Sequence, residues 1–161
     1  MNENVKIRYR INLATRHTTP PRTTTEIRRL TADDRTDLAR LILDAYTGTI
    51  DYEGETIAEA MDEVDDWLAG TDLLDHSYCA VIDSKLVSAI LLMTFEHAPF
   101  SAIVVTDPGY KGTGLARSVT HHSLSSLAQE GHDSVVLYIT KGNIPSERLF
   151  ISLGATPERE T

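Results

Sequence analysis

The chain has 161 residues, of which 41% are hydrophobic and 24% charged, as is usual for one globular domain with a substantial core. A single cysteine, Cys79, excludes an internal disulfide, and no apolar run approaches the roughly 20 residues that span a bilayer. The net charge of -9 argues against duplex DNA, or nucleic acid in general, as the main partner.

The charge is unevenly distributed along the chain. Residues 1–30 carry seven basic and two acidic side chains, whereas residues 31–66 carry two basic and twelve acidic ones. An acidic body can accept a cationic small molecule or peptide. Because the first residues also lack the apolar core of a signal peptide, we expect a cytoplasmic protein without a membrane partner. Cys79 lies in an apolar run and is expected to be a buried, inert thiol.

The first element is a strand. Apolar and polar residues alternate over residues 5–13, the period of a half-buried strand. Residues 14–25 are rich in Thr and Pro and predict a linker or loop. We therefore divide the chain into an N-terminal strand with its linker (1–25) and a main domain (26–161).

Two helices follow a short strand at residues 26–30. Thr31 is a candidate N-cap, and apolar residues at helical spacing predict a helix over 32–46. A polar loop spans 47–54, and a second helix is predicted over 56–69. The acidic face of that helix (Glu59, Asp62, Glu63, Asp65, Asp66) is interpreted as solvated.

The middle of the chain predicts antiparallel strands. Residues 77–83 and 86–95 are strand-like, with a tight hairpin between them, and residues 96–99 turn the chain into a third strand. That strand, 101–106, ends at Asp107-Pro108-Gly109 and is followed by a glycine-spaced turn, Lys111-Gly112-Thr113-Gly114.

The last predicted elements are a helix over 115–129, a strand over 134–140 and a short helix within 143–154. Gly131 and Gly154 suit helix C-termini, and Pro145 suits a first turn. Residues 155–161 are too short and polar to predict a strand. The order indicates an α+β fold: one mixed, mostly antiparallel sheet flanked by helices.

The glycine turn is a candidate anion site. Glycines allow a close backbone approach, and the first amides of the following helix face outward with the positive end of its dipole. On its own the pattern fits an ordinary strand-to-helix turn equally well.

Two motifs together resemble the GNAT acetyltransferase superfamily over residues 26–154. The first is Lys111-Gly112-Thr113-Gly114-Leu115-Ala116, similar to the family's pyrophosphate loop, with Lys where Arg or Gln is usual. The second, in the late helix, comprises Asn143, Ser146, Leu149, Phe150 and Gly154. The resemblance implies the GNAT fold, acetyl-coenzyme A as co-substrate, and an N-acetyltransferase activity toward a primary amine.

The resemblance also implies which residues bind coenzyme A. The amides of the loop would hold the pyrophosphate, with Lys111 adding a charge, and the strand Ile103-Val104-Val105 would pair with the pantetheine arm. Asn143, Ser146 and Phe150 would flank the coenzyme. Asn143 could equally be a helix N-cap, and Phe150 could equally be a core residue. The residues implied as coenzyme contacts are Ile103, Val104, Val105, Lys111, Gly112, Thr113, Gly114, Leu115, Ala116, Asn143, Ser146 and Phe150.

Members of the family use direct attack of a neutral amine on the thioester. A backbone N–H before the glycine loop polarises the carbonyl, which points to Val105 or its neighbour. The family's usual acid, a tyrosine, is replaced here by Phe150, which cannot donate a proton. Tyr138 on the neighbouring strand is the candidate substitute, although a half-buried strand residue is the preferred interpretation of it, and the thiolate could also leave to solvent.

Glu96 and His97 are the candidate general bases, since they precede the strand that would carry the acetyl group; an exposed hairpin end is the alternative. The loop between the first helices carries Asp51, Tyr52, Glu53 and Glu55. These side chains suit a cationic acceptor such as a polyamine, an aminoglycoside-like compound or a peptide N-terminus, and a solvated loop is the alternative. No Cys/His cluster has metal-ligand spacing, so no metal is expected.

Three expectations remain open at the level of sequence. The first rival function is a non-catalytic acyl-CoA-binding regulator, because Phe150 replaces the usual acid. The second is an interaction module that uses the basic N-terminal strand, and a homodimer is compatible with it. Family members usually continue past the late helix with further strands, so residues 5–13 are expected to fill that part of the sheet, in the same subunit or in a partner.

Overall fold

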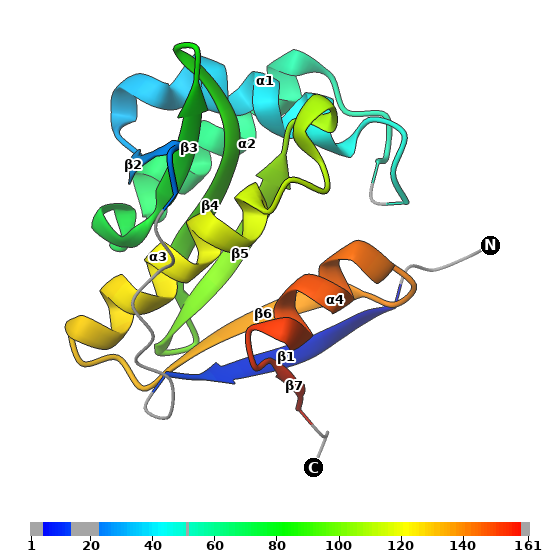
Figure 1. Cartoon of the computed structure of the whole chain (residues 1–161). Coiled ribbons are helices and arrows are strands. Elements are labelled where there is room, and N and C mark those ends of the chain that lie inside the picture. Colours follow the sequence, from blue (N-terminus) through cyan, green and yellow to red (C-terminus); the bar gives the residue numbers. More distant parts are fainter. Residues whose placement is uncertain (1–4, 14–22, 51, 159–161) are drawn as a thin grey trace.

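The structure is a computed structural model that describes residues 5–13, 23–50 and 52–158. One mixed sheet holds seven strands in the order β2-β3-β4-β5-β6-β1-β7 (Figure 1). Their bounds are β1 (Lys6–Asn12), β2 (Glu26–Arg29), β3 (Tyr78–Ile82), β4 (Lys85–Phe95), β5 (Ala98–Thr106), β6 (Ser134–Thr140) and β7 (Thr156–Pro157). Every pair is antiparallel except β5 with β6. The predicted α+β class is confirmed.

Helices cover both faces of the sheet (Figure 1). They are α1 (Arg35–Tyr46), α2 (Ile57–Gly70), α3 (Leu115–Gln129) and α4 (Ile144–Ser152), with short 3-10 helices η1 (Ala32–Asp34), η2 (Leu74–His76) and η3 (Pro108–Tyr110). One buried cluster packs α1 and α2 against the sheet, and a second packs α3 and α4 against the other face. None of the helices in the described ranges is long and apolar enough to cross a bilayer.

The N-terminal strand lies inside the sheet of its own subunit. β1 pairs with β6 from Lys6↔Thr140 to Asn12↔Ser134, and its other edge meets β7. Tyr9, Ile11 and Leu13 enter the α3–α4 core as the alternation predicted. The strand therefore completes the sheet without a partner, and the outer edge beyond it is the two-residue β7, which the sequence did not predict. Residues 14–22 of the predicted linker, and Asp51, lie outside the described residues.

The helix starts follow local capping chemistry. Thr56 begins α2 with a reciprocal capping box, in which its hydroxyl accepts from Glu59 N–H and Glu59 reaches back to the Thr56 amide. The predicted helix over 32–46 divides into η1 and α1, and the buried Asp34 carboxylate accepts from Thr31 N–H at 2.8 Å in the first turn. Burial also raises the pKa of the Cys79 thiol to about 11, which agrees with an inert thiol.

The predicted turn at 96–99 is shorter in the structure. Only Glu96 and His97 form it, with positive φ of 50° and 68°, and Ala98 and Pro99 already belong to β5. Two successive left-handed residues match the right-handed twist of a two-residue hairpin. The hairpin of Asp83 and Ser84, with φ of 50° and 63°, has the same form and was predicted.

Candidate functional site

The site begins where β5 and β6 part. These parallel strands pair only at Phe100↔Val136 and Ser101↔Leu137 and then diverge, leaving a wedge that opens toward the α1–α2 loop (Figure 1). The β4–β5 register shifts at the same point, so that Ala102 is an extra residue on β5. Such a bulge bends its strand and increases its twist. The bulge therefore accounts for β5 leaving β6 just beyond Ser101.

The backbone of β5 presents unpaired groups to this wedge. The amide of Asp107 donates to Val87 O of β4 at 2.8 Å, and Val105 O accepts from the Ser88 hydroxyl at 3.0 Å. Alternate residues of a strand point their backbone groups the same way. The N–H and C=O of Val104 therefore face the wedge, where an extended ligand chain can pair with them.

Two adjoining cavities occupy the wedge. The first has a volume of about 770 Å³, lies beside the α1–α2 loop and the β6–β1 face, and carries Lys6, Glu53, Glu55, Glu63 and Tyr138 in its wall. The second has a volume of about 840 Å³ and lies between the glycine turn and α4. The residues that line both are Tyr46, Val104, Asn143, Ser146 and Phe150.

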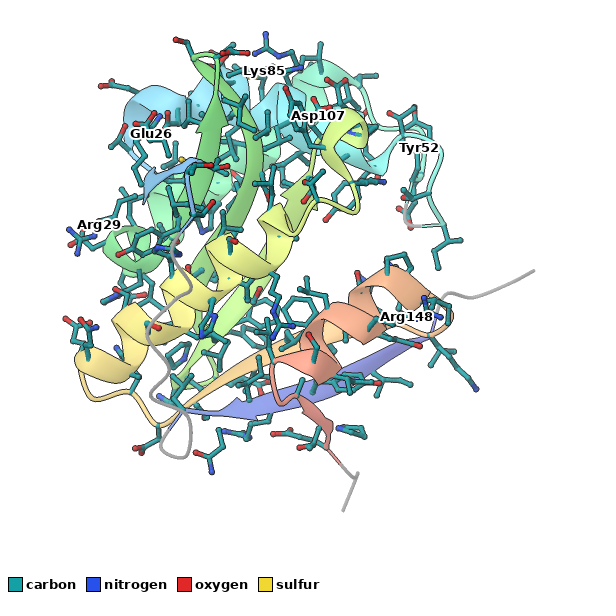
Figure 2. The ribbon with its side chains drawn as sticks, in the orientation of Figure 1. Glu26, Arg29, Tyr52, Lys85, Asp107 and Arg148 are labelled. Carbon is teal, nitrogen blue, oxygen red and sulfur yellow. The ribbon has the colours of Figure 1, made fainter. Side chains whose placement is uncertain are left out.

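The second cavity is positive. Its charged lining residues are Lys111, Arg117 and Arg148, with no carboxylate among them. Figure 2 places Arg148 of α4 across the opening from Tyr52 of the α1–α2 loop. Of these cations the sequence singled out only Lys111, because Arg117 and Arg148 stand on helix surfaces where spacing alone does not separate them from solvated residues.

The glycine turn has the geometry of an anion cradle. Gly112 and Gly114 have φ of +79° and +85°, and a Cβ at either would meet nothing within 4 Å. Gly114 is the N-cap of α3 and has no side chain to accept from the first-turn amides, which an anion can therefore use. Thr113 turns away from the cavity lining and donates its hydroxyl to Tyr110 O.

Asp107 fixes the start of this turn. Its carboxylate accepts from Gly109 N–H at 2.8 Å and pairs with Lys85 at 3.0 Å. The backbone hydrogen bond, followed by the Lys85 charge, holds the Asp107 pKa below its usual value. The strand end and the turn are thus tied together before any ligand arrives (Figure 2).

The first cavity is acidic at its rim. Glu53 and Glu55 come from the α1–α2 loop and Glu63 from α2, against the single cation Lys6. Glu63 is exposed, yet the protein atoms around its carboxyl exclude enough water to raise its pKa, and the neighbouring Glu55 charge raises it further. The sequence pattern predicts that Glu63 belongs to a solvated face, and the structure agrees in part, because Glu63 is exposed but also lines this cavity. Another member of that face, Asp65, pairs with Arg35 of α1.

The predicted coenzyme contacts come together in the wedge. Gly112, Gly114, Leu115, Ala116 and Lys111 line the second cavity, Val105 lines it too, and Ile103 lines the first. Asn143 is the N-cap of α4, since its side chain accepts from Ser146 N–H at 3.3 Å, and it also faces both cavities. Phe150 fits both core packing and contact with the coenzyme, because it is buried in the core and also lines both cavities.

The predicted bases lie elsewhere. Glu96 and His97 stand at the tip of the β4–β5 hairpin, the closed end of the wedge, and neither lines either of the two cavities described above. Glu96 instead accepts from Arg8 of β1 at 2.9 Å. Tyr138 does line the first cavity, where its ring meets Phe100 edge-on with centroids 5.9 Å apart.

Comparison with known proteins agrees with this geometry. Residues 86–161 match the family model described as FR47-like protein. The structure resembles a GCN5-related N-acetyltransferase from Sphaerobacter thermophilus, with a TM-score of 0.74 at 14% identity over 95% of this chain and 48% of that one. This likeness shows that the chain has the GNAT fold.

Another GNAT-fold structure carries the coenzyme. The paia N-acetyltransferase from Thermoplasma acidophilum, solved in complex with coenzyme A, is 18% identical over 86% of this chain and 94% of that one, with a TM-score of 0.67. Among curated relatives, mycothiol acetyltransferase from Thermobispora bispora is 43% identical over 54 residues. That match covers 34% of this chain and 18% of the relative, so the chain matches only a small part of that protein.

Proposed function

We propose that this protein transfers an acetyl group from acetyl-coenzyme A to a primary amine. One observation carries the proposal: a positive cavity and an acidic cavity adjoin at Val104, where β5 presents free backbone groups. A donor with a pyrophosphate suits the positive second cavity, and a cationic acceptor suits the acidic first cavity. The names of the curated relatives support acetyl as the transferred group.

The donor would lie along the second cavity. Its pyrophosphate would accept from the amides that follow Gly112 and Gly114, with the positive charges of Lys111, Arg117 and Arg148 around it. One of its pantetheine amides would donate to the Val104 C=O on the open edge of β5, as an added strand does, which leaves the Val104 N–H for the thioester carbonyl. This pairing would bring the thioester to the junction of the two cavities.

The reaction is a direct transfer. The amine nitrogen attacks the thioester carbonyl carbon, the C–N bond forms and the C–S bond breaks, and the nitrogen loses a proton while the thiolate gains one. The Val104 N–H faces the wedge and is the proposed donor to the developing oxyanion. Tyr138, which lines the acceptor cavity, is the proposed proton source for the thiolate, because Phe150 has no proton to give.

Glu63 is the proposed general base. Its raised pKa makes it a better proton acceptor than an ordinary glutamate, and it shares the acceptor cavity with Tyr138. Glu53 and Glu55 would attract the ammonium form of the acceptor before it loses its proton. The sequence-based choice of Glu96 or His97 is disfavoured by their place at the closed end of the wedge.

Thiol release from acetyl-CoA with a panel of primary amines tests this proposal. Replacing Glu63 with Gln should lower kcat roughly 100-fold or more, as expected when a general base is lost. Asp66→Asn, one turn further along α2 and outside both cavities, is the matched control and should leave kcat unchanged. A Glu63→Gln variant as active as this control would exclude Glu63 as the base.

The pH profile adds a second readout. Because the Glu63 pKa is raised, kcat/KM should rise with pH through an inflection above the ordinary glutamate value of about 4.3. Glu55→Gln removes a like charge and should move that inflection to lower pH. Coenzyme A binding without turnover of any amine would favour the non-catalytic regulator instead. The cytoplasmic location of the protein and its assembly into a homodimer remain predictions from the sequence.

A further inference from the structure

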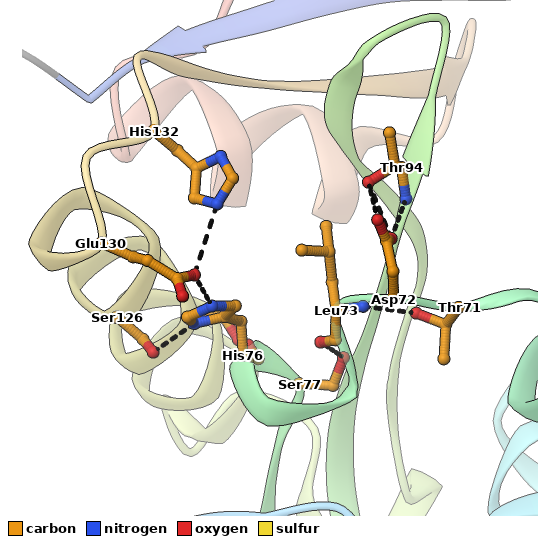
Figure 3. Close-up of polar contacts among 10 residues, drawn as sticks. Thr71, Asp72, Leu73, His76, Ser77, Thr94, Ser126, Glu130 and His132 are labelled. Carbon is orange, nitrogen blue, oxygen red and sulfur yellow. Dashed lines mark hydrogen bonds and ion pairs between the residues drawn. The ribbon is translucent and has the colours of Figure 1, made fainter.

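A second polar cluster lies away from the wedge. His76 ends η2, Glu130 follows α3, and His132 precedes β6, so three positions from two distant parts of the chain meet (Figure 3). One ligand atom from each lies within 4.8 Å of the others. None of the three lines either cavity. The cluster therefore needs an explanation separate from acyl transfer.

The two imidazoles converge on one carboxylate oxygen. Nε2 of His76 contacts Oε2 of Glu130, and Nε2 of His132 lies 3.4 Å from the same oxygen. The rings stand edge to face, with centroids 6.0 Å apart and an interplanar angle of 80°. In a tetrahedral zinc site with bonds of about 2.0–2.1 Å, neighbouring ligand atoms stand about 3.3 Å apart. Small side-chain rotations would bring these three atoms to that spacing.

His76 is held in position by α3. Its Nδ1 lies 2.6 Å from the Ser126 hydroxyl, and its backbone carbonyl accepts from the Ser123 hydroxyl at 2.6 Å. A neutral His76 that donates from Nδ1 to Ser126 keeps the Nε2 lone pair free for a cation. Metal-binding histidines usually have such a partner on the second ring nitrogen. The Ser126 contact thus supplies a second observation that points to a ligand.

Exposure leaves room for an ion and its water. The His76 side chain is 12% exposed, whereas His132 is 32% and Glu130 is 59% exposed. The most buried member is therefore the one that is fixed, and the other two can close over an ion from solution. Two imidazoles with one carboxylate favour Zn²⁺ or a similar first-row ion over Mg²⁺ and Ca²⁺, which prefer oxygen ligands throughout.

We propose that His76, Glu130 and His132 bind a divalent first-row transition-metal ion, with Zn²⁺ the best fit and water completing its coordination. The ion would join the segment that leads into β3 to the C-terminal end of α3. Its role is structural, since the site stands apart from both cavities. A chain of ion pairs without a metal is the competing interpretation.

Calorimetric titration of the full chain with ZnCl₂, after removal of metals by EDTA, tests the proposal. We expect one Zn²⁺ per chain and a Zn²⁺-dependent rise in Tm. Glu130→Gln and His132→Ala should each weaken binding roughly tenfold or more and lower the rise in Tm accordingly. His97→Ala removes a histidine outside the cluster and is the matched control. Because Glu130 is largely exposed, its variant keeps the fold and remains interpretable.

A spectroscopic test identifies the ligands more directly. Co²⁺ bound by two imidazoles and a carboxylate in a four-coordinate site gives strong visible absorption, which should appear with the native chain and with His97→Ala but not with His132→Ala. Ser126→Ala should weaken Zn²⁺ binding about tenfold while the three ligands remain. Zn²⁺ affinity that is absent in the native chain, or unchanged in Glu130→Gln and His132→Ala, would overturn the proposal and leave an ion-pair cluster.

Discussion

Gly114 offers the sharpest test of the proposed coenzyme site. At φ of +85°, alanine in place of glycine costs about 1–2 kcal/mol of backbone strain, and it regains about 0.4–1 kcal/mol by restricting the unfolded chain. No packing clash adds to this, because a Cβ would meet nothing within 4 Å. Gly114→Ala should therefore lower the free energy of unfolding by only about 1 kcal/mol. The new methyl group would project where the pyrophosphate is proposed to approach the α3 amides.

The loss of affinity should be larger than the loss of stability. Charge-assisted hydrogen bonds contribute about 1.5–3 kcal/mol each, so displacing one corresponds to roughly a 10- to 100-fold weaker Kd for coenzyme A. Gly131→Ala is a matched control: its φ is +94°, its Cβ would also meet nothing, and it lies at the far end of α3. Urea unfolding followed by the fluorescence of the sole, buried tryptophan, Trp67, gives the stability, and calorimetry gives Kd. Equal coenzyme A affinities for the two variants would refute the cradle.

Two further predictions concern the fold. Asp34→Asn should lower the free energy of unfolding by about 1 kcal/mol at pH 7, because it removes an ion pair of 2.8 Å in which Arg28 is partly exposed to solvent. Burial alone would raise the Asp34 pKa, but the hydrogen bonds from Arg28 and Thr31 lower it. The stability difference between the native protein and Asp34→Asn should therefore be complete above about pH 4 and vanish as the pH falls through the folded-state pKa of Asp34. Urea titrations at several pH values measure this difference, and a difference that grows in acid would contradict the prediction. Ile11→Ala should lower the free energy of unfolding by about 2–5 kcal/mol, because Ile11 of β1 is only 2% exposed. The control Ile151→Ala, at a residue 54% exposed, should change it by about 0.5 kcal/mol or less. Equal Cm values of the two variants in urea would mean that β1 adds little to the core.

Local patterns predicted most elements because here local and tertiary preferences agree. The alternation of residues 5–13, the helical spacing within residues 32–46 and the strand-like run of residues 134–140 each give the element that the structure shows. Capping also followed from the sequence, as at Asn143. The exceptions are local as well: the two-residue turn at Glu96–His97 required left-handed φ at two non-glycine residues, which composition does not predict.

The site could be predicted only in part, because its two cavities depend on different information. The glycine turn is contiguous in sequence, so its motif is visible there. The first cavity joins α2, β6 and β1 through the divergence of β5 from β6, which the Ala102 bulge sets. Glu63 gains its raised pKa from that assembly and has no distinguishing neighbours in the sequence. The same reasoning applies to the His76–Glu130–His132 cluster, whose members come from separate segments.

The position of β1 in the sheet has a consequence for how the chain folds. Lys6 and Thr140 are partners, so β1 can pair only after β6, which lies far along the sequence from it, has been made. Pairing across such a sequence separation has a large loop-closure entropy and is slow. Until it forms, β6 presents an open edge, which can pair with other chains. Docking of β1 is therefore expected to be the late, rate-limiting event of folding, and the first cavity stays unfinished until that event because Lys6 and β6 both line it.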